Sequence, residues 1–166
     1  MKNLRITVAA LGFSAVALVG LVAHEGYTDT AVIPIPGDRP TVGFGSTFKE
    51  DGSPVKMGDK TTPQKAIART VSHIAKDETV LKSCVTAPLS QTEYDVLVEF
   101  SYRFGAKRAC TTDVVLFINA EQYYNSCAAY LKYRRAAGKD CSILSNKCSG
   151  VWKRAQERNT KCLSSQ

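Results

Sequence analysis

The sequence predicts an α+β fold in which a small β-lobe is followed by a larger helical lobe. Residues 31–47 have the pattern of a β-hairpin, whereas apolar residues recur at helical spacing over much of the chain after residue 62. The chain has 166 residues, 44% of them hydrophobic, which is enough for one compact domain with its own core.

The β-lobe is predicted from a turn signal between two apolar runs. Gly37 and Asp38 mark the turn, and Thr41, Val42 and Phe44 suit the returning strand. Residues 48–61 are polar and rich in Gly, Lys and Asp, so we expect a loop there.

Two helices have clear start signals. Thr62 is a favourable N-cap before Pro63, which suits the first helical position. Ser90 and Glu93 have the spacing of a capping box for the next helix, and Gly105 is expected to end it.

Three further helices are predicted in the C-terminal half. A short helix through residues 114–118 is capped by Thr111 or Thr112. Residues 120–135 are expected to be helical, and the last helix is expected over residues 150–162.

The chain is basic, with a net charge of +7 and a pI near 9.2. Nucleic acid, an anionic membrane surface and an anionic cell-wall polymer are all compatible with this balance. The charge alone does not choose among them. Most basic residues are scattered, and only Lys132, Arg134 and Arg135 are clustered.

An even number of cysteines predicts three disulfides formed in an oxidising compartment. The six are Cys84, Cys110, Cys127, Cys141, Cys148 and Cys162. No Cys-x-x-Cys pair is present, so a metal site is not expected. Connectivity does not follow from spacing. A preference for local pairing favours Cys141–Cys148 and Cys110–Cys127, which leaves Cys84–Cys162.

The N-terminus combines a positive flank with an apolar run. Lys2 and Arg5 precede residues 6–23, which carry no acidic or basic side chain. This order predicts that the N-terminus stays in the cytoplasm while the rest of the chain crosses the inner membrane. As one helix, eighteen residues would span about 27 Å, slightly less than the ~30 Å hydrocarbon core.

The same segment admits a second interpretation as a cleaved signal peptide. Ala15-Val16-Ala17 has the small-x-small pattern of a cleavage site. Cleavage after Ala23 would place Leu21 at the −3 position, which is unfavourable. We therefore favour an uncleaved, weakly hydrophobic anchor that can leave the bilayer.

Residues 25–46 carry the groups with most chemical interest. Glu25 precedes the predicted hairpin, Asp38 lies at its turn, and Thr41 begins the returning strand. Hydrolysis of a glycosidic bond needs an acid for the leaving oxygen and a second carboxylate for water or for the developing positive charge. A threonine hydroxyl can orient the water.

Here the sequence resembles the phage-type lysozymes, the endolysin muramidases. The resemblance begins with Glu25-Gly26 and, at the family's interval, Thr41-Val42-Gly43-Phe44-Gly45. It continues through Lys56-Met57-Gly58-Asp59, Leu89-Ser90 and Gly150-Val151-Trp152-Lys153-Arg154. It implies a lysozyme-like fold, peptidoglycan as substrate, and no metal or organic cofactor.

The resemblance also implies roles for individual residues. Glu25 is expected to be the general acid, Thr41 to position the water, and Arg154 to form an ion pair with Glu25. The family's usual acidic position, six residues before the threonine, is Ile35 here. Asp38 is therefore the first candidate for the second carboxylate, and Asp29 is the reserve.

Family members with such N-terminal segments are signal-anchor-release endolysins. The resemblance thus divides the chain into an anchor, residues 1–23, and a monomeric catalytic domain, residues 24–166. In soluble relatives a short helix precedes the catalytic glutamate, and residues 14–24 are expected to supply it after release. Four apolar residues of this helix are then expected to pack on the helical lobe, namely Val16, Leu18, Val19 and Val22.

Two other functions stay open from the sequence. A lytic transglycosylase would use one acid and no positioned water, so Asp38 and Thr41 argue against it. A membrane-anchored cell-wall-binding protein without activity is the other alternative. Nucleic acid is not expected as a partner.

Overall fold

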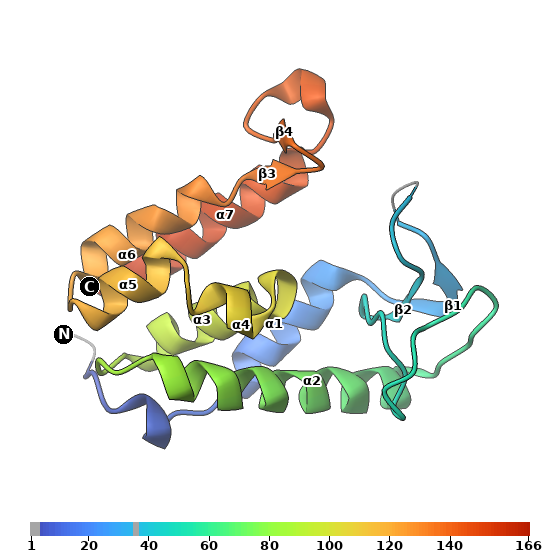
Figure 1. The fold of residues 1–166 in the computed structure, drawn as a ribbon, viewed down its shortest axis with the longest axis horizontal. Helices are drawn as coiled ribbons and strands as arrows, with labels where there is room; N and C mark the ends of the chain where they lie inside the picture. The colour runs from blue at the N-terminus through green and yellow to red at the C-terminus, as the bar shows by residue number, and fades with distance from the viewer. Residues whose placement is uncertain (1–3, 35–36) are drawn as a thin grey trace. The chain divides into compact units, whose positions relative to one another are not determined.

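Helices make up most of the chain, and the strands form two small antiparallel sheets (Figure 1). The computed structural model describes residues 4–34 and 37–166. The predicted α+β class, with a helical majority, is therefore confirmed.

The elements have the following bounds. The α-helices are α1 (Ala15–Glu25), α2 (Pro63–Cys84), α3 (Gln91–Phe104), α4 (Ala106–Ala109), α5 (Asp113–Asn119), α6 (Tyr123–Ala129) and α7 (Ser149–Leu163). The strands are β1 (Thr28–Val32), β2 (Thr41–Gly43), β3 (Arg135–Ala136) and β4 (Lys139–Asp140). The short 3-10 helices are η1 (Val8–Ala10), η2 (Tyr130–Lys132) and η3 (Leu144–Asn146).

The chain forms two compact units, and the boundary between them falls within α2. Ser14–Lys76 form one, called here the hairpin unit because it contains the β1–β2 hairpin after α1. Met1–Phe13 and Asp77–Gln166 form the other, the helical unit. Each unit has its own buried apolar residues.

In the hairpin unit, β1 and β2 pair antiparallel, as the sequence predicts. Thr28 lies opposite Gly43 and Val32 opposite Thr41, with an irregularity between the two pairs. The first strand therefore starts earlier than the predicted residue 31. Ala31, Val42 and Val55 form a small buried cluster beneath the strands.

The predicted helix ends are largely confirmed. The Thr62 hydroxyl accepts a hydrogen bond from Lys65 N–H at 3.4 Å, at the start of α2. Ser90 and Glu93 form a complete capping box at α3, and Gly105 is the C-cap of that helix. These ends depend on residues close together in the chain, which is why local sequence patterns predict them.

The core of the helical unit contains an aromatic cluster. Helix α3 packs against α7, and Phe100 of α3 is fully buried. Its ring lies 4.5 Å from Phe104, 5.3 Å from Tyr130 and 4.9 Å from Tyr133, measured between ring centroids. The last two contacts are edge-to-face, an arrangement that aromatic quadrupoles favour.

The helix expected over residues 120–135 is only partly correct. Helix α6 and η2 cover its centre, but Arg135 lies in β3, which pairs with β4. Ala137 and Gly138 join these strands with φ angles of 47° and 76°. Two positive φ angles in a two-residue loop give a hairpin turn whose twist matches that of the strands.

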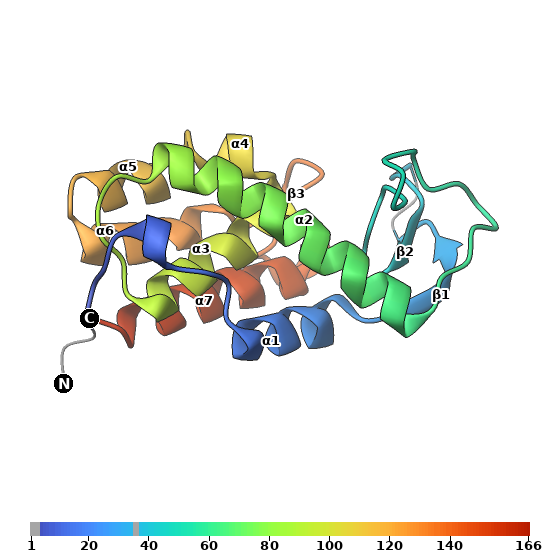
Figure 2. The ribbon, with the colours of Figure 1, turned by 90° about the horizontal axis from the view of Figure 1, so that it is seen from below.

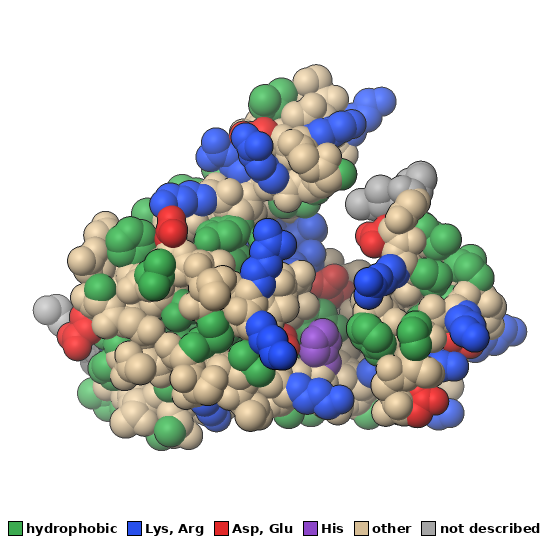
Figure 3. Space-filling model, in the orientation of Figure 1, with side chains coloured by type: hydrophobic (Ala, Val, Ile, Leu, Met, Phe, Trp, Pro, Cys, Tyr) green, Lys and Arg blue, Asp and Glu red, His purple; other side chains and the backbone are tan. Residues whose placement is uncertain are grey.

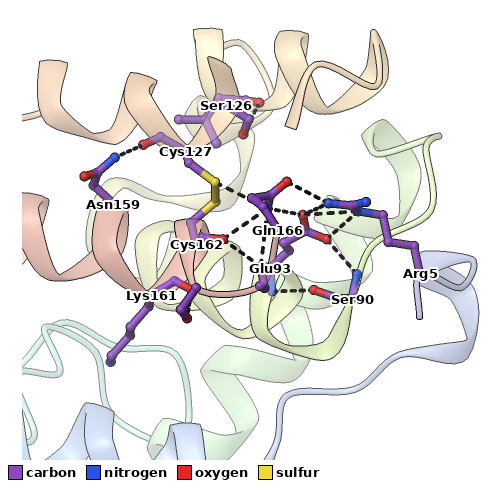
Figure 4. The surroundings of a disulfide bond; sticks show 12 residues. Arg5, Ser90, Glu93, Ser126, Cys127, Asn159, Lys161, Cys162 and Gln166 are labelled. Atoms are coloured by element: carbon purple, nitrogen blue, oxygen red, sulfur yellow. Dashed lines mark hydrogen bonds and ion pairs between the residues drawn. A yellow bond between two sulfur atoms is a disulfide. The ribbon is translucent and has the colours of Figure 1, made fainter. Parts of the chain in front are cut away.

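Three disulfides are present, but two of the expected pairings are wrong. Cys141–Cys148 is confirmed, whereas the other bonds are Cys84–Cys110 and Cys127–Cys162. The Cys127–Cys162 bond joins α6 to α7, which pack against each other (Figure 4). Pairing follows this helix packing rather than the shortest separation along the chain.

The expectation of one apolar helix over residues 6–23 is wrong for this conformation. The segment divides into η1 and α1, because the Ser14 hydroxyl caps α1 by accepting a hydrogen bond from Ala17 N–H at 3.1 Å. Among the residues that the model describes, no helix has both the length and the apolar character needed to span a membrane. Val16 and Val19 are exposed rather than packed, and Leu21 is the buried residue of α1.

Residues 4–13 are instead part of the helical unit. Ile6 and Leu89 exchange two backbone hydrogen bonds of 2.9 Å, and Val8 and Leu11 are buried. The N-terminal segment lies beside the C-terminal end of the chain (Figure 2). The start of an apparent membrane segment thus serves as a strand-like element of the folded domain.

Arg5 holds this segment through a buried carboxylate (Figure 4). Its guanidinium donates to Glu93 at 2.7–3.2 Å and to Gln166 Oε1 at 2.8 Å. The Glu93 side chain is only 3% exposed. Burial opposes its ionisation, but hydrogen bonds from Arg5, Ser90 N–H and Gln166 outweigh burial and lower the pKa of Glu93.

Candidate active site

Glu25 is the last residue of α1 and is half-buried. The helix ends there because Gly26 follows with a φ of 69°, a conformation that glycine adopts at little cost. A helix therefore does precede the candidate acid, as expected from the resemblance. It delivers the Glu25 carboxylate to the start of the β1–β2 hairpin.

A tight turn follows β2 and contains the two glycines of the Thr-x-Gly-x-Gly motif. Val42 and Ser46 exchange backbone hydrogen bonds of 3.0 and 3.1 Å, which closes the turn around Gly43 and Gly45. Both glycines have positive φ angles, 68° and 79°. The backbone of this turn thus requires glycine at both motif positions, which explains their spacing of two residues.

Each glycine of the turn also lies close to another element. A β-carbon on Gly43 would lie 2.8 Å from the Cβ of Ala66, in the first turns of α2. A β-carbon on Gly45 would lie 3.5 Å from Oε2 of Glu25. The turn therefore packs against α2 through Gly43 and lies beside the Glu25 carboxylate through Gly45.

An aromatic pair joins the segment that follows Glu25 to the turn after β2. The rings of Tyr27 and Phe44 lie 5.5 Å apart, and Phe44 is buried. The Tyr27 hydroxyl donates to the carbonyl oxygen of Thr61 at 3.2 Å. These contacts bring the residues after Glu25 against the turn after β2.

Thr41 starts β2 opposite Val32 and is half-buried. Its hydroxyl lies 3.5 Å from the carbonyl oxygen of Val32, the limit for a hydrogen bond. Such a long contact leaves the hydroxyl able to bond a water or a substrate group. The expected role of Thr41 is compatible with this position but is not tested by it.

The two candidates for the second carboxylate are both exposed. Asp38 lies in the connection beyond the Val32–Thr41 end of the strands, and its carboxylate accepts a hydrogen bond from Arg39 N–H at 2.8 Å. This is the local bonding of a turn residue. Asp29 lies on β1, and its carbonyl accepts a hydrogen bond from Thr61 N–H. Ile35, which occupies the family's usual acidic position and whose expected replacement is Asp38, is outside the described residues.

Arg154 lies on α7 in the helical unit and is half-buried. A β-carbon on Gly150 would lie 3.5 Å from its Nη1, so the guanidinium folds back along the helix over that glycine. Glu25 and Arg154 are in different units, and their ion pair stays a prediction.

Sequence patterns missed an ion pair that supports the hairpin unit. Arg69 of α2 donates to Glu50 at 2.7 Å, which ties the loop over residues 48–61 to the helix. This hydrogen bond lowers the pKa of Glu50. The two residues are separated by a loop without periodic pattern, so nothing in the sequence signalled their contact.

The described residues contain no group of three or more His, Cys, Asp and Glu side chains that could bind a metal ion. Among the candidate groups, the structure places the half-buried Glu25 carboxylate at a helix end, beside the glycine turn. A carboxylic acid in such a place can protonate a leaving group, provided that burial and neighbours keep it protonated.

Comparison with known proteins identifies a family. The family model for phage lysozyme matches residues 22–157. An endolysin of Salmonella phage P22 is 31% identical over 120 residues, covering 72% of this chain and 77% of the relative. A SAR-endolysin of Pseudomonas phage phiKMV is 30% identical over 150 residues, covering 90% and 87%.

Solved structures agree on the fold. An endolysin from the Escherichia coli O157:H7 phage FAHEc1 is similar, with a TM-score of 0.79 at 24% identity over 95% of this chain and 96% of that chain. A lysozyme of phage P22 has a TM-score of 0.74 at 25% identity, over 92% and 99%. The expected lysozyme-like fold is therefore confirmed.

Proposed function

The chain belongs to the phage lysozyme family, and we propose that it is an endolysin muramidase that lyses the host cell. Its substrate is peptidoglycan, and the bond cleaved is the β-1,4 bond between N-acetylmuramic acid and N-acetylglucosamine. The observation that carries this proposal is the Glu25 carboxylate at the end of α1, against Gly45 of the Thr-x-Gly-x-Gly turn.

Glu25 is the general acid in the proposed reaction. It donates its proton to the glycosidic oxygen as the bond to the anomeric carbon breaks. Thr41 orients the attacking water through its hydroxyl. Asp38 accepts the proton of that water, so that the sugar gains a hydroxyl and Asp38 a proton. If Asp38 acts in this way, the reaction inverts and the two carboxyl groups lie roughly 6.5–9.5 Å apart in the active enzyme.

Arg154 is the proposed partner of Glu25. An ion pair would stabilise the Glu25 carboxylate that forms when the acid donates its proton to the leaving group. Substitution of Arg154 with Met should therefore alter the pH profile of activity, whereas a merely structural role would change stability alone.

The test of the proposed function is loss of turbidity of permeabilised Gram-negative cells. Wild type should clear the suspension and Glu25→Gln should not, while Glu121→Gln, an exposed carboxylate in the helical unit, serves as the control. The masses of the released muropeptides identify the reaction. Hydrated ends support hydrolysis, and anhydro ends would identify a lytic transglycosylase.

Before release, residues 6–23 are proposed to lie in the inner membrane, with the N-terminus in the cytoplasm and the rest of the chain outside. The uncharged run behind Lys2 and Arg5 is the basis for this topology, and the similarity to a SAR-endolysin supports later release to the periplasm. In this proposal residues 1–23 are the anchor, residues 24–166 the catalytic domain, and the released periplasmic form is a monomer.

The described conformation supports a released state that is incompatible with that anchor. The contacts of Arg5 with Glu93, and of Phe13 N–H with Glu78 at 2.9 Å, place residues 5–13 within the helical unit. A bilayer-spanning helix would break these contacts and the Ser14 cap of α1. Since α1 carries Glu25, the membrane form would lack the helix that orients the acid.

A further inference from the structure

A closed projection follows η2 and leads into α7. Strands β3 and β4 form its stem, and the Cys141–Cys148 disulfide closes the loop beyond the stem. We call residues 135–148 the disulfide loop.

Hydrogen bonds to Asp140 make the disulfide loop rigid. The Asp140 carboxylate accepts from Ser142 N–H at 2.9 Å and from its hydroxyl at 2.7 Å, and Arg134 Nε donates to both carboxylate oxygens at 3.1–3.2 Å. The Asn146 amide donates to the Asp140 carbonyl at 2.7 Å. The Ser142 bonds, followed by Arg134, lower the pKa of Asp140 to about 2. The only carboxylate of the loop is therefore already bonded.

Two large aliphatic side chains on this loop are exposed to solvent. Ile143 is 53% exposed and Leu144, at the start of η3, is 84% exposed. A single exposed aliphatic residue is ordinary on a protein surface. Two adjacent exposed aliphatic residues on a loop fixed by a disulfide and by side-chain hydrogen bonds are instead held in a position from which they can bind an apolar partner.

Exposed basic side chains lie on the same loop as the aliphatic pair. Arg135, Lys139 and Lys147 are exposed, and none of them forms an ion pair within residues 4–34 and 37–166. Figure 3 shows Lys and Arg side chains beside hydrophobic ones on this projection. The loop thus combines exposed aliphatic side chains with a net positive charge.

We propose that the disulfide loop binds an anionic phospholipid surface. Ile143 and Leu144 enter the interface between headgroups and acyl chains, and Arg135, Lys139 and Lys147 bind the headgroup phosphates. A glycan is the less suitable ligand, because aliphatic side chains lack the flat aromatic face that stacks on a sugar ring. The loop would keep the released enzyme at the membrane face that borders the cell wall.

The test compares binding of full-length variants to lipid vesicles by co-sedimentation. Vesicles of phosphatidylcholine alone are compared with vesicles that also contain phosphatidylglycerol. Wild type should prefer the anionic vesicles, and this preference should fall as salt rises. The Ile143→Ser/Leu144→Ser variant should bind about tenfold or more weakly, and Lys139→Gln/Lys147→Gln about tenfold more weakly.

Leu116→Ser is the matched control, because Leu116 is 59% exposed on α5, outside the loop. All variants keep residues 6–23, so any lipid binding by that segment is common to them. Equal binding of wild type and the loop variants, or equal loss with Leu116→Ser, would overturn the proposal. So would loop variants that lose binding to insoluble peptidoglycan while keeping their binding to vesicles. Intact mass and circular dichroism check that each variant keeps its disulfides and fold.

Discussion

The carboxylate of Glu25 lies beside Gly45, on the side where any other residue would carry its β-carbon. A β-carbon on Gly45 would come within 3.5 Å of Oε2 of Glu25, and the Gly45 φ angle of 79° is itself unfavourable for any other residue. The turn after β2 therefore requires a glycine at the last position of the Thr-x-Gly-x-Gly motif, and this glycine also leaves open space beside the candidate acid.

Gly45→Ala is predicted to impair catalysis more than it impairs folding. The positive φ costs about 1–2 kcal/mol of stability, and the added methyl lies in van der Waals contact with Oε2 of Glu25, where it occupies space that water or substrate needs beside the acid. We expect kcat to fall at least about tenfold. The control is Gly52→Ala, because Gly52 has a φ of 82° in the same unit but no atom within 4 Å of an added β-carbon.

Both variants should lose similar stability in thermal unfolding, and only Gly45→Ala should lose kcat. A Gly52→Ala variant with the same loss of kcat would mean that backbone strain alone explains the effect. In that case the contact with Glu25 has no catalytic consequence.

The second carboxylate is predicted to be Asp38. Asp38→Asn removes the proposed proton acceptor, while its amide oxygen can still accept the hydrogen bond from Arg39 N–H. Muramidase activity should fall by at least about a hundredfold. Asp29→Asn is the paired variant, since Asp29 is also an exposed carboxylate of the hairpin unit, and it should stay near wild type. The reverse result would transfer the role to Asp29.

The ends of several helices were predictable because neighbouring residues determine them, whereas Phe44, expected on the returning strand, lies in the turn after β2. Thr62, the Ser90 capping box and Gly105 act over one helical turn, and the sequence contains everything that they need. The β3–β4 turn escaped prediction because Ala137 holds a positive φ without being glycine or asparagine. Its conformation is imposed by the surrounding hairpin and disulfide.

Disulfide pairing and the N-terminal segment were not predictable for a different reason. Cys127 bonds Cys162 because α6 packs on α7, a tertiary contact that spacing does not report. Residues 6–23 are apolar enough for lipid and equally suitable for a protein core, where Leu11 and Leu21 are buried. Composition alone cannot distinguish these two environments.

The Arg5–Glu93 pair should make the docking of the N-terminal segment pH-dependent. The pKa of Glu93 is lowered in the folded state, so its stabilising contribution is complete above its ordinary value of 4.5 and is lost as pH falls through the lower folded value. Glu93→Gln should thus be less stable than wild type at neutral pH, and the difference should shrink below pH 4.5.

Arg5→Met should cost about 3 kcal/mol at neutral pH, because it leaves a nearly buried carboxylate without its partner. Asp113→Asn, which removes an exposed ion pair with Lys132, is the control and should have little effect. Chemical unfolding at several pH values measures both. A stability difference between wild type and Glu93→Gln that stays constant down to acid pH would contradict this account.

The Cys127–Cys162 disulfide should stabilise the helical unit more than Cys141–Cys148 does. It closes a separation of 35 residues, against 7 for the other bond, and loop-closure entropy grows with the loop. The Cys127→Ala/Cys162→Ala variant should lose about 3–4 kcal/mol, and Cys141→Ala/Cys148→Ala less. Thermal unfolding of the two variants measures this order of stability, and both variants should keep wild-type activity at low temperature. An equal loss of stability in the two variants would contradict the prediction.

Control by the N-terminal segment can be tested without disturbing the released fold. A β-carbon on Gly12 or on Gly20 would meet no atom within 4 Å, and neither residue has a positive φ. Gly12→Leu/Gly20→Leu should therefore leave the folded domain intact while making residues 6–23 more hydrophobic. Each leucine favours the membrane-inserted helix by about 0.5 kcal/mol or more relative to a polar or small residue.

The leucine variant should stay in the membrane fraction and delay lysis after an uncoupler is added, whereas wild type should become soluble. Gly12→Ser/Gly20→Ser is the matched control, with similar side-chain addition but no gain in hydrophobicity, and should be released like wild type. Since Glu25 is carried by α1, retention in the bilayer should also suppress turbidity loss. Equal release of the leucine variant and wild type, or an N-terminus that begins after Ala17, would show that residues 6–23 do not act as a releasable anchor.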